Sequence, residues 1–490
     1  MVRIVTYKGL TYDDVLLIPQ NSRISSRSDT NPSTQLSTHI NLAIPFVSSN
    51  VDTVTESAMA ITMAKLGGIG IIHRFMSIAR QVYEVDKVKR SEGFIMGSPF
   101  TLTPDKTLEE ARNEMKRNKV TSFIVVNEKN KVLGLVSERD MWFRGKLNPK
   151  ITELMTPAAK LITAPPMTTL KEARELFKRH KVEKLPLVKK DGTLIGLITS
   201  RTVLNEVRFP HATKDEKGRL RVGAAVGVVG DYLDRAAELV KAGVDALVVD
   251  IAHVHSTHGM QALKKMRSAF PKIDLIGGNI ATGEAAKDLI RIGCDALKVG
   301  IGPGGICITR IVAGAGVPQL TAIMQCADAA HKYKIPVIAD GGTNFPGDMT
   351  KALAAGASTV MLTGWLAGTD ESPGNIILRN GQKYKVHRGA ASFSAVASRK
   401  IEGVGGQVRK ELTGAELDEE LEKVVAEGVE TFIHYKGAAK DVINQLTGAL
   451  RSGMSYSNAK TVLELWKNAR FMEITAAGFR ESKQHNVEEI

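Results

Sequence analysis

The chain has 490 residues, which is too long for one ordinary domain and predicts two or three. Its 43% hydrophobic and 24% charged residues are typical of a globular protein. The net charge is +14, but the basic residues are spread along the chain and aromatic residues make up only 5%, which argues against a nucleic-acid partner. With three cysteines (Cys294, Cys307, Cys326) and no apolar run of about 18 residues, we expect a cytoplasmic protein without a membrane partner.

The first part of the chain, residues 1–95, contains two short apolar runs at 46–50 and 68–73. Runs of this length are typical of buried strands. Asn50 stands at the end of the first run and is a candidate for a binding site.

An internal repeat lies within residues 96–208. Segment 107–112 recurs at 169–174 and segment 134–140 recurs at 196–202, both displaced by 62 residues. Each copy predicts a helix, two short strands and the start of another helix. Two copies of one such unit predict a single compact module inserted into the surrounding chain.

Short apolar strands alternate with helices in the third part, residues 209–490. Together with the strands of residues 1–95 they give about eight strand–helix units, the number in a TIM barrel, so we expect an α/β fold of this type. Catalytic residues of such barrels stand at the carboxyl ends of the strands. The expected strands of this part are 222–228, 246–251, 275–278, 296–299, 337–339 and 359–362.

A glycine-rich loop at 302–310 follows one of these strands and contains a single cysteine, Cys307, with Thr309 two residues later. Cysteine is the strongest nucleophile among side chains near neutral pH. A small buried thiol in a structural turn is the alternative. The position at a strand end of the expected barrel favours the nucleophile.

Six segments of the chain resemble the IMP dehydrogenase/GMP reductase family, and the resemblance covers nearly the whole chain. It implies a TIM barrel that binds a purine nucleoside monophosphate and a nicotinamide dinucleotide, as a homotetramer or octamer. The segments are 10–17, 51–56, 298–310, 312–319, 339–342 and 366–374.

The repeat resembles a tandem pair of CBS motifs, a Bateman module, which implies a site for adenine or guanine nucleotides. An aspartate after Ser/Thr often holds the ribose there. The first copy has Ser137 and Asp140, whereas the second has Thr202 at the equivalent position. A purely structural module therefore stays an alternative.

The resemblance also implies roles for individual residues. Catalysis would fall to Cys307, Thr309 and Glu427. The nicotinamide cofactor, NAD or NADPH, would be held by Asp250, Asn279 and Gly300, and a K⁺ ion by Gly302, Gly304, Cys307, Glu481 and Ser482, the last two from a neighbouring subunit. The substrate residues would be Asn50, Gly305, Asp340, Gly341, Gly342, Thr363, Gly364 and Ala391.

Two reactions of this family remain open, because Cys307 can serve both. A dehydrogenase converts IMP, NAD⁺ and water to XMP and NADH for guanine nucleotide biosynthesis, and a reductase converts GMP and NADPH to IMP and ammonia. In the predicted flap, residues 385–440, segment 414–418 lacks the Arg-Tyr pair of dehydrogenases, and Asn50 also resembles the reductases. The inserted repeat and the C-terminal tail resemble dehydrogenases, which we take as the primary interpretation. A non-catalytic nucleotide sensor is a further alternative.

Overall fold

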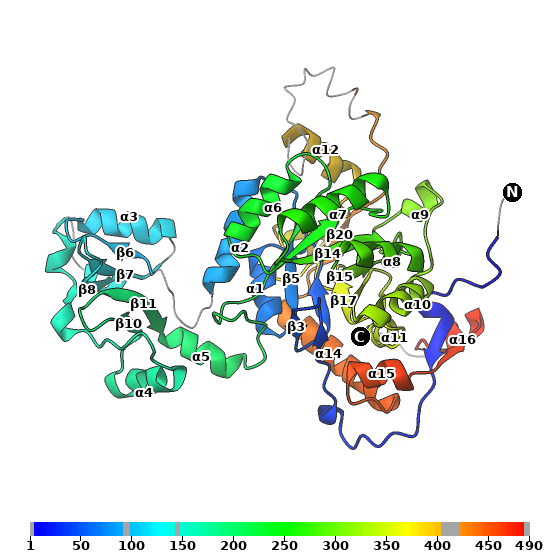
Figure 1. Cartoon of the computed structure of the whole chain (residues 1–490), viewed down its shortest axis with the longest axis horizontal. Coiled ribbons are helices and arrows are strands. Elements are labelled where there is room, and N and C mark those ends of the chain that lie inside the picture. Colours follow the sequence, from blue (N-terminus) through cyan, green and yellow to red (C-terminus); the bar gives the residue numbers. More distant parts are fainter. Residues whose placement is uncertain are drawn as a thin grey trace. The chain divides into compact units, whose positions relative to one another are not determined.

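A computed structural model of the chain contains two compact units (Figure 1). The larger one, the barrel unit, comprises residues 1–91, 211–215 and 220–490, and the smaller one, the inserted unit, comprises residues 92–210 and 216–219. The residues that the structure describes are 4–91, 99–118, 120–142, 148–402, 419 and 422–484.

Eight short parallel strands close into a barrel within the barrel unit. Each strand pairs with the next one, β17 pairs with β4, and β5 pairs with β12 to complete the circle. The predicted TIM barrel is therefore confirmed. The strands are β4 (Phe46–Ser48), β5 (Ile69–Ile72), β12 (Gly223–Val226), β13 (Ala246–Asp250), β14 (Asp274–Ile280), β15 (Ala296–Val299), β16 (Val337–Asp340) and β17 (Thr359–Leu362).

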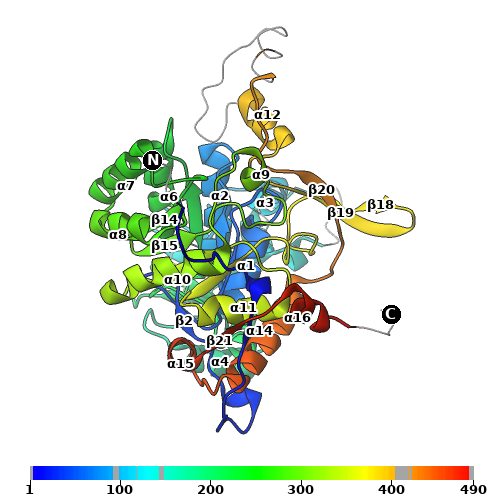
Figure 2. The same ribbon diagram turned by 90° about the vertical axis from the view of Figure 1, so that its right-hand side faces the viewer.

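Helices follow the strands and surround the barrel (Figure 2). Local sequence sets their ends: α8 begins after Thr282, whose hydroxyl accepts a hydrogen bond from the N–H of Ala285, and ends at Gly293, which has a φ of 95°. Among the helices that the structure describes, none is long and apolar enough to cross a membrane. The barrel helices are α1 (Ser57–Lys65), α2 (Ile78–Ser91), α6 (Tyr232–Lys241), α7 (Thr257–Ala269), α8 (Gly283–Ile292), α10 (Gln319–Ala330), α11 (Pro346–Ala354) and α14 (Ala439–Tyr456).

Apolar side chains fill the inside of the barrel. Val47, Ile71, Val248 and Ile338 belong to one buried cluster, which also contains Leu36 from the hairpin of β2 (Thr34–Gln35) and β3 (Asn41–Leu42). A filled interior leaves the loops at the carboxyl ends of the strands as the place where a TIM barrel binds its ligands.

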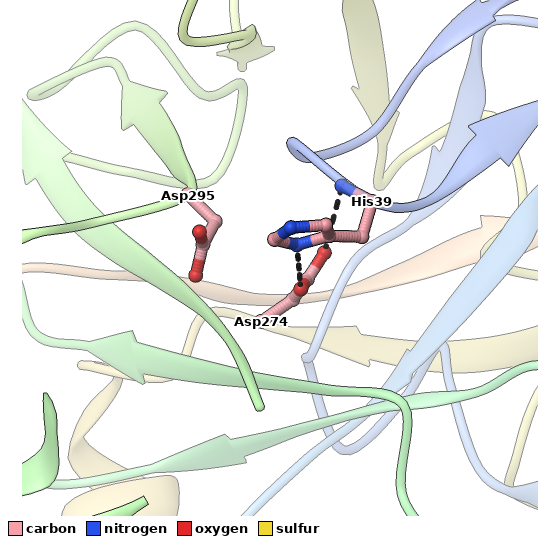
Figure 3. Close-up of side chains that lie close together, drawn as sticks. All are labelled: His39, Asp274 and Asp295. Atoms are coloured by element: carbon pink, nitrogen blue, oxygen red, sulfur yellow. Dashed lines mark hydrogen bonds and ion pairs between the residues drawn. The ribbon is translucent and has the colours of Figure 1, made fainter. Parts of the chain in front are cut away.

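Three titratable side chains meet at the amino ends of β14 and β15 (Figure 3). His39 Nδ1 lies 2.8 Å from Asp274 Oδ1. Asp295 accepts a 2.8 Å hydrogen bond from the N–H of Leu275 and is paired with Arg267. Both carboxylates thus have partners within the protein, at the face of a TIM barrel that serves stability. We assign this group a structural role.

A buried lysine fixes the point where the chain leaves the barrel unit and returns to it. Lys89, near the end of α2, is 3% exposed, and its Nζ lies 2.7 Å from Asp245 Oδ2 and 3.1 Å from Asp215 Oδ2. The same ammonium donates a 3.0 Å hydrogen bond to the carbonyl of Leu220. Two buried carboxylates therefore share one buried cation.

Replacing Lys89 by methionine is expected to lower the free energy of unfolding by about 3–5 kcal/mol, because a buried carboxylate without its cation is strongly destabilising. Urea denaturation followed by circular dichroism measures this. The matched control is Lys241→Met in α6, whose lysine is 71% exposed beside Glu238 and should contribute less than about 1 kcal/mol. Equal transition midpoints for the two variants would contradict the prediction.

Further elements of the barrel unit extend from both ends of the chain and from the segment after β17. Strand β1 pairs with β21, while β18, β19 and β20 form an antiparallel sheet whose β18–β19 hairpin projects from the unit in Figure 2. These elements are η1 (Tyr12–Asp14), β1 (Val15–Leu17), η2 (Arg27–Asp29), α9 (Thr309–Val312), η6 (His331–Tyr333), β18 (Ile377–Arg379), β19 (Gln382–Arg388), α12 (Phe393–Glu402), β20 (Glu430–His434), α15 (Val462–Asn468), β21 (Phe471–Glu473) and α16 (Ala476–Glu481).

The inserted unit repeats one local design. In each copy a threonine and a glutamate form the same N-terminal cap: the N–H of Thr107 donates to Glu110 and that of Thr169 to Glu172, both at 2.8 Å. Its elements are β6 (Thr101–Leu102), α3 (Leu108–Asn118), β7 (Ser122–Val126), β8 (Val132–Ser137), η3 (Glu138–Met141), η4 (Ile151–Glu153), β9 (Thr156–Pro157), η5 (Ala158–Lys160), α4 (Leu170–His180), β10 (Lys184–Val188), β11 (Leu194–Thr199) and α5 (Ser200–Arg208).

Candidate active site

The barrel brings most of the predicted site residues to one end. Asp250 and Asp340 are the last residues of β13 and β16, Asn279 lies near the end of β14, and Asn50 and Thr363 follow β4 and β17. These positions are up to several hundred residues apart in sequence, and the closed sheet places them around one opening.

The loop that follows β15 needs glycine at two positions. Gly300 has a φ of +151° and a Cβ there would lie 2.0 Å from the carbonyl oxygen of Asp340. Gly302 has a φ of +79° and a Cβ there would lie 2.5 Å from Cγ of Arg310. The loop can therefore pass close to the end of β16 only with glycine at 300, and close to the Arg310 side chain only with glycine at 302.

Cys307 lies in this loop beside a hydroxyl and a carboxylate. Its Sγ is 3.3 Å from Thr309 Oγ1, and that hydroxyl donates a 2.7 Å hydrogen bond to Glu427 Oε2. Cys307 is half-buried, whereas Cys294 and Cys326 are fully buried. Burial raises the pKa of both of these other thiols to about 12, so neither is a thiolate near neutral pH. The arrangement singles out Cys307 as the accessible nucleophile.

Backbone hydrogen bonds hold the Glu427 segment against the cysteine loop. The N–H of Ile308 donates to the carbonyl of Glu427 at 2.9 Å, and the N–H of Val429 donates to the carbonyl of Ile306 at 3.0 Å. The carboxylate thus reaches the loop from the predicted flap. The segment 414–418, where the Arg-Tyr pair is missing, lies outside the described residues.

Two adjoining cavities open around Cys307. The first has a volume of about 420 Å³, and the second a volume of about 300 Å³. Both are lined by Asn279, Gly300, Gly302, Cys307, Asp340 and Thr363, so they meet at the thiol. Of the other predicted residues, Gly304, Gly305, Gly341, Gly342 and Gly364 line the first cavity, and Asn50, Asp250, Thr309 and Ala391 line the second.

Four polar residues form a buried network between the two cavities. Lys298, 2% exposed within β15, has its Nζ 2.7 Å from Asp250 Oδ1 and 3.0 Å from Asp340 Oδ2. Asn279 accepts a hydrogen bond from the same ammonium and donates to Asp340 Oδ2 at 2.9 Å. Burial alone would raise the pKa of Asp250, but Lys298, Arg74 and a hydrogen bond from Asn50 outweigh it, and the pKa lies below its ordinary value.

Sequence reasoning assigned no role to two residues of this region, Lys298 and His387. A lysine inside a short apolar strand was the available signal for Lys298. His387, the next-to-last residue of β19, lines the first cavity, and its Nδ1 is 3.0 Å from Thr53 Oγ1. Burial and, secondarily, Lys436 lower the pKa of His387 to about 4, so its imidazole is neutral near pH 7. The sequence held no comparable signal for it.

The predicted cation ligands come from two places. Gly302, Gly304 and Cys307 lie in the cysteine loop, where the carbonyl of Gly304 accepts a 3.0 Å hydrogen bond from the N–H of Cys307. Glu481 ends α16 and Ser482 follows it, with the Ser482 hydroxyl donating to the carbonyl of Gly478 at 3.0 Å. Carbonyl and carboxylate oxygens are the ligands that a hard cation prefers. The K⁺ site stays a prediction.

The fold and this thiol-centred site define a barrel enzyme, and comparisons with known proteins identify its family. The model of the IMP dehydrogenase / GMP reductase domain matches residues 9–485, and the chain belongs to this family of NAD(P)-dependent oxidoreductases. It is 48% identical to inosine-5'-monophosphate dehydrogenase of Nitrosopumilus maritimus over 98% of both chains. It is 49% identical to that of Aquifex aeolicus over 98% of this chain and 96% of the relative.

A solved structure is similar over the same length. The crystal structure of a cysteine-to-alanine variant of GMP reductase from Trypanosoma brucei, in complex with guanosine 5'-monophosphate, has a TM-score of 0.91 and 42% identity and covers 98% of both chains. A reductase thus shares the whole length of this chain, the inserted unit included. The inserted unit and the tail therefore do not distinguish a dehydrogenase from a reductase.

Proposed function

We propose that this chain is an oxidoreductase that acts at C2 of a purine nucleoside monophosphate through a covalent adduct with Cys307. The observation that carries the proposal is the row formed by Cys307, Thr309 and Glu427 where the two cavities meet. Thiolate attack forms a bond between Sγ and C2. Thr309 and Glu427 transfer protons to and from the water or ammonia that enters or leaves at that carbon.

The first cavity would hold the nucleotide. Asp340 would accept charge-assisted hydrogen bonds from the ribose hydroxyls. The loops after β16 and β17, with Gly341, Gly342, Thr363 and Gly364, would receive the 5'-phosphate on backbone N–H groups, as TIM barrels commonly do at this place. Gly305 borders the same space.

The second cavity would hold the dinucleotide, which accepts or donates the hydride. Asp250, at the end of β13, suits a ribose of the cofactor. Asn279 donates its amide N–H groups to Gly300 and Asp340, and its Oδ1 can accept a further hydrogen bond from the carboxamide of the cofactor. The residues fit this ligand because a carboxylate and an amide border the cavity next to the thiol. Asn50 and Ala391 also line it.

We propose IMP dehydrogenase with NAD⁺ as the reaction, following the names of the curated relatives. GMP reductase with NADPH is the second candidate. Two features favour it: segment 414–418 lacks the Arg-Tyr pair, and Asn50 resembles the reductases. Both reactions use the same thiol.

An absorbance assay separates the two reactions. The purified chain is offered IMP with NAD⁺ in one cuvette and GMP with NADPH in another, and the nicotinamide band is followed. We expect the band to rise in the first mixture. Activity only in the second mixture would overturn the dehydrogenase assignment, and activity in neither would favour a nucleotide sensor.

We further propose a homotetramer or octamer in the cytoplasm, with K⁺ in the cysteine loop completed by Glu481 and Ser482 of a neighbouring subunit. The inserted unit would bind an adenine or guanine nucleotide in its cavity of about 770 Å³, which Ser137 and Asp140 line. Ser137 donates a 2.7 Å hydrogen bond to Asp140 there, whereas the second copy has Thr199 and Thr202 at 3.0 Å and no carboxylate. This asymmetry favours the site of the first copy.

A further inference from the structure

Lys298 connects four neighbouring strands of the barrel at the level of the site. It belongs to β15, and its ammonium contacts Asp250 of β13, Asn279 of β14 and Asp340 of β16. The side chain is 2% exposed, so these contacts take the place of water around the charge.

The two carboxylates on this ammonium both border the second cavity, and one of them also borders the first. Asp340 lines both cavities, whereas Asp250 lines only the second among the two. In the described part of the chain, the hydrogen bonds to the Asp340 carboxylate from Lys298 and Asn279 both end on Oδ2, which leaves Oδ1 for a ligand. Each carboxylate can therefore serve its own ligand while both share one cation.

The positive charge of the Lys298 ammonium offsets the repulsion between the Asp250 and Asp340 carboxylates. Two carboxylates close together in a buried site repel each other and favour protonation of one of them. Burial alone would lower the pKa of Lys298, yet the two carboxylates raise it above its ordinary value, so the cation is firmly charged. An ionised carboxylate binds a hydroxyl pair more strongly than a protonated one does.

We propose that Lys298 is a positioning residue that orients Asp340 for the nucleotide and Asp250 for the dinucleotide, and thereby couples the two sites. The inference rests on the proposed function, because it takes Asp340 and Asp250 to hold the two ligands. Lys298 also lines the second cavity, but the inference requires no contact between its side chain and either ligand.

The first test is Lys298→Met, which keeps the length of the side chain and removes the charge. We expect KM for the nucleotide and for the dinucleotide each to rise about tenfold or more, the loss of roughly one good charged hydrogen bond. Alkylation of Cys307 by iodoacetamide should proceed at the wild-type rate within about threefold, because the thiol lies outside the network. Unchanged KM values would overturn the inference.

Two double variants distinguish positioning from mere charge balance. The variants are Lys298→Met/Asp250→Asn and Lys298→Met/Asp340→Asn. They have the same net charge, and each retains only one of the two carboxylates. Calorimetric titration with IMP and GMP compares each double variant with its single aspartate variant, Asp250→Asn or Asp340→Asn. If Lys298 acts on the nucleotide through Asp340, adding Lys298→Met should lower nucleotide affinity in the Asp250→Asn background and cost little more in the Asp340→Asn background. A purely structural role for Lys298 predicts the same further loss in both backgrounds, and mere charge balance predicts no loss in either. Each of these results would contradict the proposal.

The same titrations separate this inference from the proposed function. If the wild-type chain binds neither IMP nor GMP, the proposed function fails. If the wild type binds and Lys298→Met changes nucleotide affinity equally in the Asp250→Asn and Asp340→Asn backgrounds, only the role of Lys298 is wrong. The double variants also carry the test should Lys298→Met not fold, because each has lost one positive and one negative charge together.

Discussion

Cys307→Ala is expected to abolish turnover, by at least about 10⁴-fold, while IMP and GMP still bind. The reason is that the reaction would go through a bond between Sγ and C2, and alanine offers no nucleophile. The residues that would receive ribose and phosphate stand on other strands and are unchanged. The nicotinamide absorbance assay measures the first effect, and calorimetric titration measures the second.

The matched control is Cys326→Ala in α10. Cys326 is fully buried, and burial raises the pKa of its thiol to about 12, so it cannot serve as a nucleophile near neutral pH. This variant should turn over like the wild type within a few-fold. Turnover that persists in Cys307→Ala would exclude the covalent mechanism. Binding without turnover in the wild type itself would instead favour the sensor.

The strands of the barrel could be predicted because each is a short apolar run bounded by turn residues. Most of their residues are buried, so their sequences are largely apolar runs rather than alternations. The loop around Cys307 could be predicted for a related reason, since close approach to β16 demands glycine at 300 and close approach to Arg310 demands it at 302. These signals lie within short segments, so a single sequence is enough to detect them.

The contacts of the site were harder to predict because they are long-range. The hydrogen bond between Thr309 and Glu427 joins residues 118 apart in sequence, and only the family resemblance pointed to Glu427. Lys298 shows a different difficulty: a charge within an apolar strand has no meaning until its partners on β13 and β16 are known. His387 comes from a strand outside the barrel and reaches the first cavity only through the fold.

Glu427→Gln is expected to lower kcat by about 10²–10⁴-fold, the usual contribution of a general acid–base group. Glutamine can still accept the hydrogen bond from Thr309, so the geometry is preserved, but it cannot take up a proton. Steady-state kinetics measure the loss. The matched control is Glu430→Gln, three residues along the same segment, whose carboxylate pairs with Ser394 instead and is exposed. A kcat within about threefold of wild type would exclude a role for Glu427 in proton transfer.

The same variant reports on the direction of the reaction. In the dehydrogenase, attack by Cys307 and loss of hydride precede the step that needs a base, which is attack of water on C2. Glu427→Gln should then release a rapid burst of about one NADH per active site before it stalls as the covalent adduct, which intact-protein mass spectrometry detects. In the reductase, ammonia must leave C2 before hydride arrives, so proton transfer comes first. The variant would then be slow from its first turnover, without a burst. This result would contradict the dehydrogenase assignment and would still support a role for Glu427 in proton transfer.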